Sequence, residues 1–255
     1  MTGRLTVVGL GPGHAELTTP AASAALAAAT DLIGYGPYLD RIAAAPDGQR
    51  RHASDNRVEL ERARHALELA ASGKSVAVVS GGDPGVFAMA AAVFEAIEMG
   101  PAEWRALDIR VEPGVTAMLA AAAEIGAPLG GDFCAISLSD NLKSWTTITR
   151  RLEAACAGDF VIALYNPLSR ARPHQLGEAF DILRRNKPPS TIIVMVRAAG
   201  SGEMRRITTT LGDVDPDQAD MRTLVMIGSS ATRLIARDGR DDPWVYTPRR
   251  EEGAR

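Results

Sequence analysis

The chain alternates between short apolar runs and longer segments in which apolar residues recur at helical spacing. The runs LTVVGL (5–10) and SVAVVS (75–80) are rich in β-branched residues, which is typical of buried strands. The segment 55–73 places Ala66 and Ala70 on one helical face. Strands that alternate with helices of this length predict an α/β protein with mainly parallel or mixed sheets.

In the first half of the chain, we expect strands at 5–10, 31–36, 75–80 and 107–113 and helices at 18–30, 55–73 and 88–100. In the second half, we expect helices at 116–126, 144–156 and 172–186 and strands at 132–139, 160–167, 191–197, 205–211 and 223–228. Thr18 or Thr19 is the expected cap of the first helix, and Asp55 or Asn56 that of the second, which Gly73 ends.

The elements group into two α/β lobes joined near Pro113. We expect an N-terminal lobe at 1–113, a C-terminal lobe at 117–247 and a loose polar tail at 248–255. In α/β folds, ligands bind in the crevice beyond the carboxyl ends of the strands. We therefore expect a ligand cleft between the two lobes.

Composition excludes several classes of protein. The chain has 255 residues and a formal net charge of −3, which argues against a nucleic-acid binder. No apolar run approaches the roughly 20 residues of a membrane span, and a strand begins too close to Met1 to leave room for a signal peptide. Cys134 and Cys156 show no metal-ligand spacing and fit a reducing compartment. The expected location is the cytoplasm.

Arginine carries most of the positive charge, since only three of the 28 basic residues are lysines. A GC-rich genome explains this bias by itself. Alternatively, some arginines bind carboxylates, which suit the planar guanidinium. The histidines His52, His65 and His174 are expected to face solvent.

The stretch LTVVGLGPG (5–13) runs from an apolar strand directly into glycines. A dinucleotide-binding fingerprint requires a third glycine where this chain has His14, and its acidic residue would be Asp31, which lies at the wrong end of its strand. A phosphate loop fails because no Gly-Lys-Ser/Thr follows. What remains is a strand end without side chains, which either forms a tight turn or admits a ligand close to the backbone.

Three further stretches repeat this design, namely VVSGGDPGVF (78–87), EPGVTAM (112–118) and ALYNPLSRARP (163–173). In the first, Asp83 offers a carboxylate to a cation or hydroxyl. In the third, Asn166 offers an amide to a purine edge, and the ring of Tyr165 a surface for stacking. Each stretch alone is also explained as an ordinary turn or helix entry. Four such strand ends in one chain favour ligand binding.

Together these motifs resemble the tetrapyrrole (precorrin) methylase family, which uses S-adenosylmethionine. The resemblance rests on V-x-G-x-G-P-G at 7–13, Gly-Asp-Pro at 82–84 and Pro-Gly-Val-Thr-Ala at 113–117, and it extends over about 3–247. The stretches 126–140, 162–176 and 221–232 look most like the branch that methylates precorrin-3B at C(17) and contracts the ring in cobalamin biosynthesis, giving precorrin-4. Members of this branch commonly carry histidine where this chain has Gly131.

The resemblance implies which residues contact each ligand. The implied cofactor contacts are Pro12, Gly81, Gly82, Asp83, Val86, Thr116, Ala117, Tyr165 and Asn166. The implied contacts to the anionic tetrapyrrole are Gly11, Gly13, His14, Arg170 and Arg172. The resemblance also implies the tetrapyrrole methylase fold and a homodimer. We expect no metal site, no nucleic-acid partner and no membrane, and we identify no catalytic acid or base.

Other functions remain open from the sequence. A methylase of the C(11) type, or the anaerobic counterpart that acts on cobalt-precorrin-3, would carry similar lobes. A nicotinamide-dependent oxidoreductase rests on the glycines alone. A tetrapyrrole carrier without turnover would bind the pigment but not consume S-adenosylmethionine.

Overall fold

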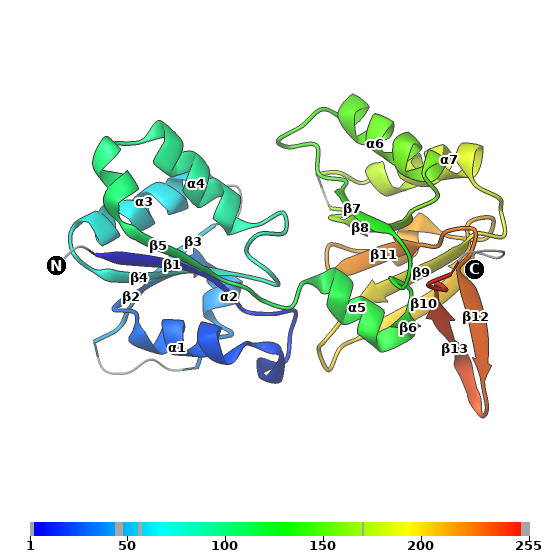
Figure 1. The fold of residues 1–255 in the computed structure, drawn as a ribbon, viewed down its shortest axis with the longest axis horizontal. Helices are drawn as coiled ribbons and strands as arrows, with labels where there is room; N and C mark the ends of the chain where they lie inside the picture. Colours follow the sequence, from blue (N-terminus) through cyan, green and yellow to red (C-terminus); the bar gives the residue numbers. More distant parts are fainter. Residues whose placement is uncertain (1–2, 44–47, 56–57, 170, 251–255) are drawn as a thin grey trace. The chain divides into compact units, whose positions relative to one another are not determined.

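The computed structural model describes residues 3–43, 48–55, 58–169 and 171–250. The chain divides into two compact units, Met1–Ala117 and Met118–Arg255, which we call unit one and unit two (Figure 1). Each contains its own sheet and its own hydrophobic core. Within the described residues, every helix is too short or too polar to cross a membrane.

Unit one is built on a parallel sheet of five strands in the order β3-β2-β4-β1-β5. The strands are β1 (Arg4–Gly9), β2 (Asp31–Tyr35), β3 (Arg50–Ser54), β4 (Ser75–Ser80) and β5 (Asp108–Glu112). Its helices are α1 (Pro20–Ala28), α2 (Gly36–Leu39), α3 (Glu59–Ala71) and α4 (Met89–Met99), with short 3₁₀ helices at Ala15–Leu17 and Ala102–Ala106.

Side-chain alternation along the central strands builds a core on each face of this sheet. In β1, Leu5 and Val7 pack into the core that α3 and α4 cover, while Val8 packs into the core on the α1 side. In the neighbouring β4, Val78 and Val79 divide between the two cores in the same way. A parallel sheet covered on both faces needs such continuous apolar strands, which is why these runs were recognisable in the sequence.

Unit two has a mixed sheet in the order β10-β9-β11-β8-β7, in which only β7 and β8 are parallel neighbours. The strands are β7 (Phe133–Ser137), β8 (Val161–Tyr165), β9 (Ile192–Arg197), β10 (Arg205–Thr210) and β11 (Thr223–Ile227). The helices are α5 (Ala117–Ile125), α6 (Trp145–Ala157) and α7 (Gln175–Asn186), with a 3₁₀ helix at Pro216–Gln218. The α/β prediction with parallel and mixed sheets is therefore confirmed.

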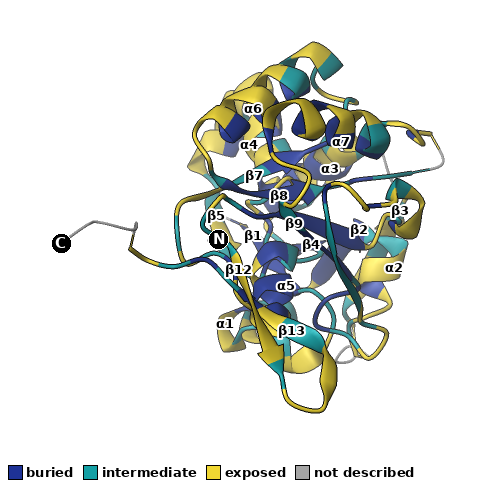
Figure 2. Cartoon of the chain, turned by 90° about the vertical axis from the view of Figure 1, so that its right-hand side faces the viewer, coloured by how far each residue is buried: buried dark blue, intermediate teal, exposed yellow. Residues whose placement is uncertain are grey.

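A second, smaller sheet in unit two pairs β12 (Arg233–Arg237), β13 (Arg240–Tyr246) and the short β6 (Gly126–Ala127). Figure 2 shows that the β12–β13 hairpin is mostly exposed. Its strands were not predicted, and neither was β3.

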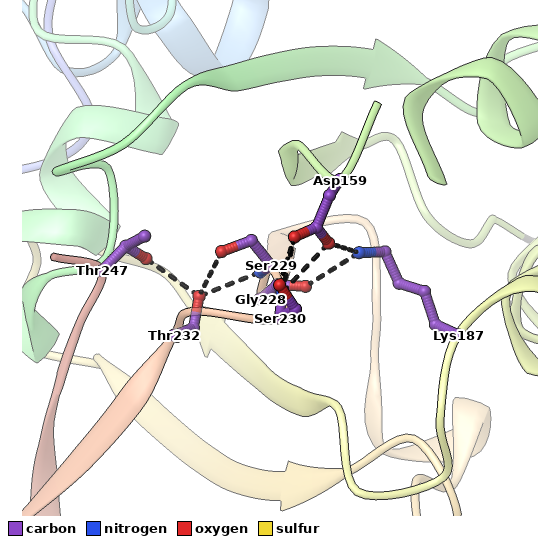
Figure 3. A network of polar contacts seen from close by, with 7 residues as sticks. All are labelled: Asp159, Lys187, Gly228, Ser229, Ser230, Thr232 and Thr247. Carbon is purple, nitrogen blue, oxygen red and sulfur yellow. Dashed lines mark hydrogen bonds and ion pairs between the residues drawn. The ribbon is translucent and has the colours of Figure 1, made fainter. Parts of the chain in front are cut away.

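A polar network in unit two joins the loops at the start of β8 and the end of β11 (Figure 3). The Lys187 ammonium, whose side chain is only 4% exposed, lies 3.0 Å from a carboxylate oxygen of Asp159 and 3.4 Å from the carbonyl oxygen of Gly228. Asp159 is half-exposed and also accepts hydrogen bonds from the backbone N–H and the hydroxyl of Ser230. The network holds a buried cation in a fixed position.

The first residue of β2, Asp31, is buried beneath a polar cluster in unit one. His52, on β3, places Nε2 2.8 Å from its carboxylate, and the Thr30 hydroxyl donates to the same group at 2.8 Å. Burial raises the pKa of Asp31, but these hydrogen bonds and the charge of Lys74 outweigh it and leave the pKa below its ordinary value. The prediction that His52 faces solvent is wrong, because its side chain is only 27% exposed and its Nδ1 lies 3.2 Å from Nε2 of His65.

The predicted helix caps were partly right. Thr19 caps α1, since its hydroxyl oxygen accepts a hydrogen bond from the backbone N–H of Ala22. The cap predicted for α3 at Asp55 is wrong, because the helix begins at Glu59 and Val58 occupies the N-cap position without a side-chain hydrogen bond. The alternative, Asn56, lies outside the described residues.

Candidate functional site

The carboxyl ends of three adjacent strands, β4, β1 and β5, meet at one edge of the unit-one sheet. Each strand runs directly into one of the glycine-rich stretches found in the sequence. The parallel register brings Gly9, the last residue of β1, opposite Ser80, the last residue of β4. Three segments that are distant in sequence thus form one surface.

Backbone hydrogen bonds join the first two stretches. Gly11 N–H donates to the Gly82 carbonyl at 3.2 Å, and Gly82 N–H donates to the Gly11 carbonyl at 3.0 Å. Both residues have positive φ, 68° and 65°, a region that glycine adopts without the cost that a Cβ imposes. The two loops are therefore held to each other by their main chains.

Close packing explains two further glycines. A Cβ at Gly9 would lie 2.7 Å from the nitrogen of Gly114 and 2.8 Å from the carbonyl oxygen of Gly82. A Cβ at Gly114 would collide with the same carbonyl oxygen. These two glycines are needed because the loops touch each other, whatever ligand binds there.

The Asp83 carboxylate connects the second stretch to the third. One oxygen accepts a hydrogen bond from Gly85 N–H at 2.8 Å, and the other accepts one from Gly114 N–H at 3.0 Å. The sequence assigned this carboxylate to a ligand cation or hydroxyl, and that contact stays a prediction. In the structure both oxygens accept backbone hydrogen bonds and hold the loops after β4 and β5 together.

The remaining cofactor residues predicted on unit one lie on these same loops. Pro12, Gly81, Val86 and Ala117 are half-buried, while Thr116 is buried just before α5. A Cβ added at Gly82 would point toward the backbone of Thr116 and would lie 3.7 Å from its Cα atom. The structure thus gathers these residues at one edge with little side-chain bulk.

The Tyr-Asn-Pro stretch follows β8 in unit two. Asn166 has a positive φ of 53°, and its side-chain amide donates to the hydroxyl of Ser137, at the end of the parallel neighbour β7, at 2.9 Å. The Tyr165 hydroxyl accepts a hydrogen bond from the backbone N–H of Met118 at 3.0 Å. These contacts fix both side chains on the carboxyl edge of their own sheet, and their predicted contact with the cofactor stays a prediction.

The predicted substrate residues divide between the two units. On unit one, Gly11 is buried and Gly13 half-buried, while His14 is exposed at the start of a 3₁₀ helix. On unit two, Arg172 is buried and donates to the carbonyl oxygen of Asn166 at 3.1 Å, so one of its nitrogens supports the Tyr-Asn-Pro turn. Arg170 lies outside the described residues.

Two residues of this edge carried no signal in the sequence. The ring of Tyr38 lies against Gly81, where an added Cβ would be 2.7 Å from its Cζ atom. Arg41 donates to three carbonyl oxygens of the first stretch, those of Leu10, Gly11 and Gly13. Both follow β2, at the α2 corner, and no local motif marks them.

Comparison with known proteins adds a second kind of evidence. Residues 4–215 match the sequence profile of the Tetrapyrrole (Corrin/Porphyrin) Methylases. A relative from Sinorhizobium sp, named precorrin-3B C(17)-methyltransferase, is 60% identical over 254 residues, which cover 100% of this chain and 99% of the relative.

Two solved structures are similar. The methyltransferase CobJ superposes with a TM-score of 0.91 at 54% identity, covering 96% of this chain and 100% of that chain. A uroporphyrin-III C-methyltransferase from Thermus thermophilus, complexed with S-adenosyl homocysteine, has a TM-score of 0.70 at 22% identity, over 94% of this chain and 98% of that one. This second likeness concerns the fold alone.

Proposed function

Because this chain belongs to the tetrapyrrole (corrin/porphyrin) methylases, we propose that it methylates precorrin-3B at C(17), with ring contraction to precorrin-4, in cobalamin biosynthesis. The observation that carries this choice of substrate is the 60% identity, over the whole chain, to a relative named for that reaction. The methyl donor is S-adenosylmethionine, which supplies a methyl group already activated on a sulfonium.

The loops at the carboxyl ends of β4, β1 and β5 have the chemical character that a sulfonium methyl donor requires. Methyl transfer from a sulfonium requires orientation and exclusion of water more than a reactive side chain. Gly11, Gly82 and Gly114 have no side chain that could compete for the methyl group, and the Asp83 carboxylate between them is engaged by two backbone N–H groups. Orientation of two reactants is worth about 7–11 kcal/mol of barrier in favourable cases.

Rigidity is the contribution that the chain's own residues make to this orientation. The Gly11–Gly82 bridge and the Asp83 carboxylate fix the three loops to one another before any ligand arrives. Because these loops are ordered before the ligand binds, less of the binding free energy is lost in ordering them. We assign cofactor binding to this edge together with Tyr165 and Asn166, and binding of the anionic tetrapyrrole to Gly11, Gly13, His14, Arg170 and Arg172.

We further propose that the active enzyme is a cytoplasmic homodimer. The family resemblance supports the dimer, and the scarcity of cysteine supports a reducing compartment. Sedimentation equilibrium of the purified protein at micromolar concentration should give twice the mass of the 27.0 kDa chain. A monomer would contradict the dimer.

The function is tested by incubating the purified protein with S-adenosylmethionine and precorrin-3B. Mass spectrometry should show one added methyl group and one equivalent of S-adenosylhomocysteine, and fragmentation should place the methyl at C(17). Parallel reactions with cobalt-precorrin-3 and with a C(11) methylase substrate distinguish the related enzymes. Tetrapyrrole binding without consumption of S-adenosylmethionine would indicate a carrier and refute the proposal.

A further inference from the structure

Arg41 makes an unusual set of contacts with the first glycine-rich stretch. Its Nη2 atom lies 3.1 Å from the carbonyl oxygen of Leu10, 3.0 Å from that of Gly11 and 3.3 Å from that of Gly13. One guanidinium nitrogen thus contacts the carbonyl oxygens of three residues in a single turn. Such a turn exposes several carbonyl groups that need donors, because its irregular backbone cannot pair them internally.

Part of the Arg41 guanidinium is withdrawn from water by the turn that it contacts, although the residue as a whole is exposed. Burial lowers the pKa of this guanidinium, and the nearby Tyr38 acts in the opposite direction. Among the described residues, the structure records no carboxylate within salt-bridge distance of Arg41. The side chain also lines a cavity with Leu10 and Ile42. A cation in such a place is stabilised by the carbonyl dipoles it binds, so its position and that of the turn depend on each other.

The two ends of the turn are anchored differently. At the inner end, Leu10 N–H donates to Ser80, and Gly11 exchanges hydrogen bonds with Gly82. At the outer end, Arg41 is the one hydrogen-bond partner recorded for Gly13 among the described residues. Loss of Arg41 would therefore free the Gly13 carbonyl, while the bridge to Gly82 and the hydrogen bond from Leu17 N–H to the His14 carbonyl persist.

We propose that Arg41 is a positioning residue that sets the Pro12–His14 turn and through it the affinity for the tetrapyrrole. This inference rests on the proposed function, in which Gly11, Gly13 and His14 contact the tetrapyrrole. Most of the cofactor contacts lie on the other two loops, which Asp83 holds without help from Arg41. Affinity for the cofactor should therefore change much less than affinity for the tetrapyrrole.

The test compares the full-length variants Arg41→Met and Arg41→Lys with wild type. A matched control is Arg184→Met, because Arg184 likewise donates to two backbone carbonyl groups, those of Leu211 and Val214, but in unit two. Initial rates are measured with each substrate varied in turn, and binding of S-adenosylhomocysteine is measured by calorimetry. In Arg41→Met, KM for the tetrapyrrole should rise at least tenfold while the Kd for S-adenosylhomocysteine changes less than threefold. Arg41→Lys should lie between Arg41→Met and wild type, and Arg184→Met should change neither constant.

Backbone order parameters from 15N NMR relaxation test the positioning step without turnover. In Arg41→Met, the order parameters of Gly13 and His14 should fall below those of wild type, while the N–H of Gly82, which donates to the Gly11 carbonyl, keeps its protection against hydrogen exchange. Equal losses of affinity for both ligands, or unchanged order parameters at Gly13 and His14, would overturn the proposal. An inactive wild-type protein that also fails to bind S-adenosylhomocysteine would instead refute the proposed function, and the relaxation experiment would still decide whether Arg41 holds the turn.

Discussion

Replacing Asp83 with alanine removes the acceptor for two backbone N–H groups that lie in different loops, those of Gly85 and Gly114. A hydrogen bond to a charged group contributes about 1.5–3 kcal/mol, so the pair amounts to about 3–6 kcal/mol. Asp83 is only half-buried, and water replaces part of this loss. We therefore expect the free energy of unfolding to fall by about 2–4 kcal/mol.

The variant Asp83→Asn separates the two bonds. Asparagine keeps one carbonyl oxygen as an acceptor but turns an amide donor toward the second N–H group, so it should retain about one bond. Chemical denaturation measures the stability of both variants, and Glu95→Ala, on an exposed position of α4, serves as control. Calorimetry should show S-adenosylhomocysteine binding weakened about tenfold in Asp83→Ala, a loss of about 1.4 kcal/mol. If Asp83→Ala unfolds within about 0.5 kcal/mol of wild type, as ordinary surface substitutions do, the reasoning about the loops is wrong.

Three further outcomes follow from contacts elsewhere in the chain. The folded-state pKa of Asp31 lies below its unfolded value, so its stabilising contribution is complete above about pH 4 and is lost as the pH falls through the folded pKa. Denaturation between pH 2 and 6 should show a shallower acid loss in Asp31→Asn than in wild type, and identical slopes would contradict this. Asp159→Ala leaves the buried ammonium of Lys187 without its counter-ion and should lower the free energy of unfolding by about 3 kcal/mol. Lys187→Met should lower it less, because the carboxylate that it leaves is half-exposed. If urea unfolding gives the reverse order, Lys187 is not the buried charge that Asp159 stabilises. Gly9→Ala forces the loops apart and should cost about 1–3 kcal/mol and weaken S-adenosylhomocysteine binding, whereas unchanged binding would mean that the loop contacts are dispensable.

Local patterns predicted the elements that are buried on both sides. The strands that carry Val7 and Val78 are continuous apolar runs, because both faces of the parallel sheet are covered. β3 was not predicted because its sequence, Arg-Arg-His-Ala-Ser, contains no apolar run. It lies at the edge of the sheet and its residues are exposed or only half-buried, so the strand does not need apolar side chains. The β12–β13 hairpin did leave a signal, the Asp238-Gly239 pair, in which Gly239 has a positive φ of 70°.

The candidate site was predictable as a set of strand ends but not as a set of contacts. Glycines after apolar strands are visible in the sequence because the pattern is local. The distant partner of Asp83 is the N–H of Gly114, which lies 31 residues away in the sequence and has no side chain. The partners of Arg41 are likewise backbone carbonyl groups. Every residue has a backbone N–H or carbonyl group, apart from the N–H of proline. A side chain that binds a distant backbone group therefore cannot be matched to its partner from residue types in the sequence.

The mutual packing of Gly9, Gly82 and Gly114 has a consequence for protein engineering. Side chains at these positions force the loops apart or strain the backbone, so a mutant library aimed at them would yield mainly destabilised proteins. Their backbone surface also carries little information about which pigment is methylated. A programme that seeks to redirect the enzyme to another acceptor should keep this cradle constant and diversify the side chains around it, beginning with His14 and the turn after β8.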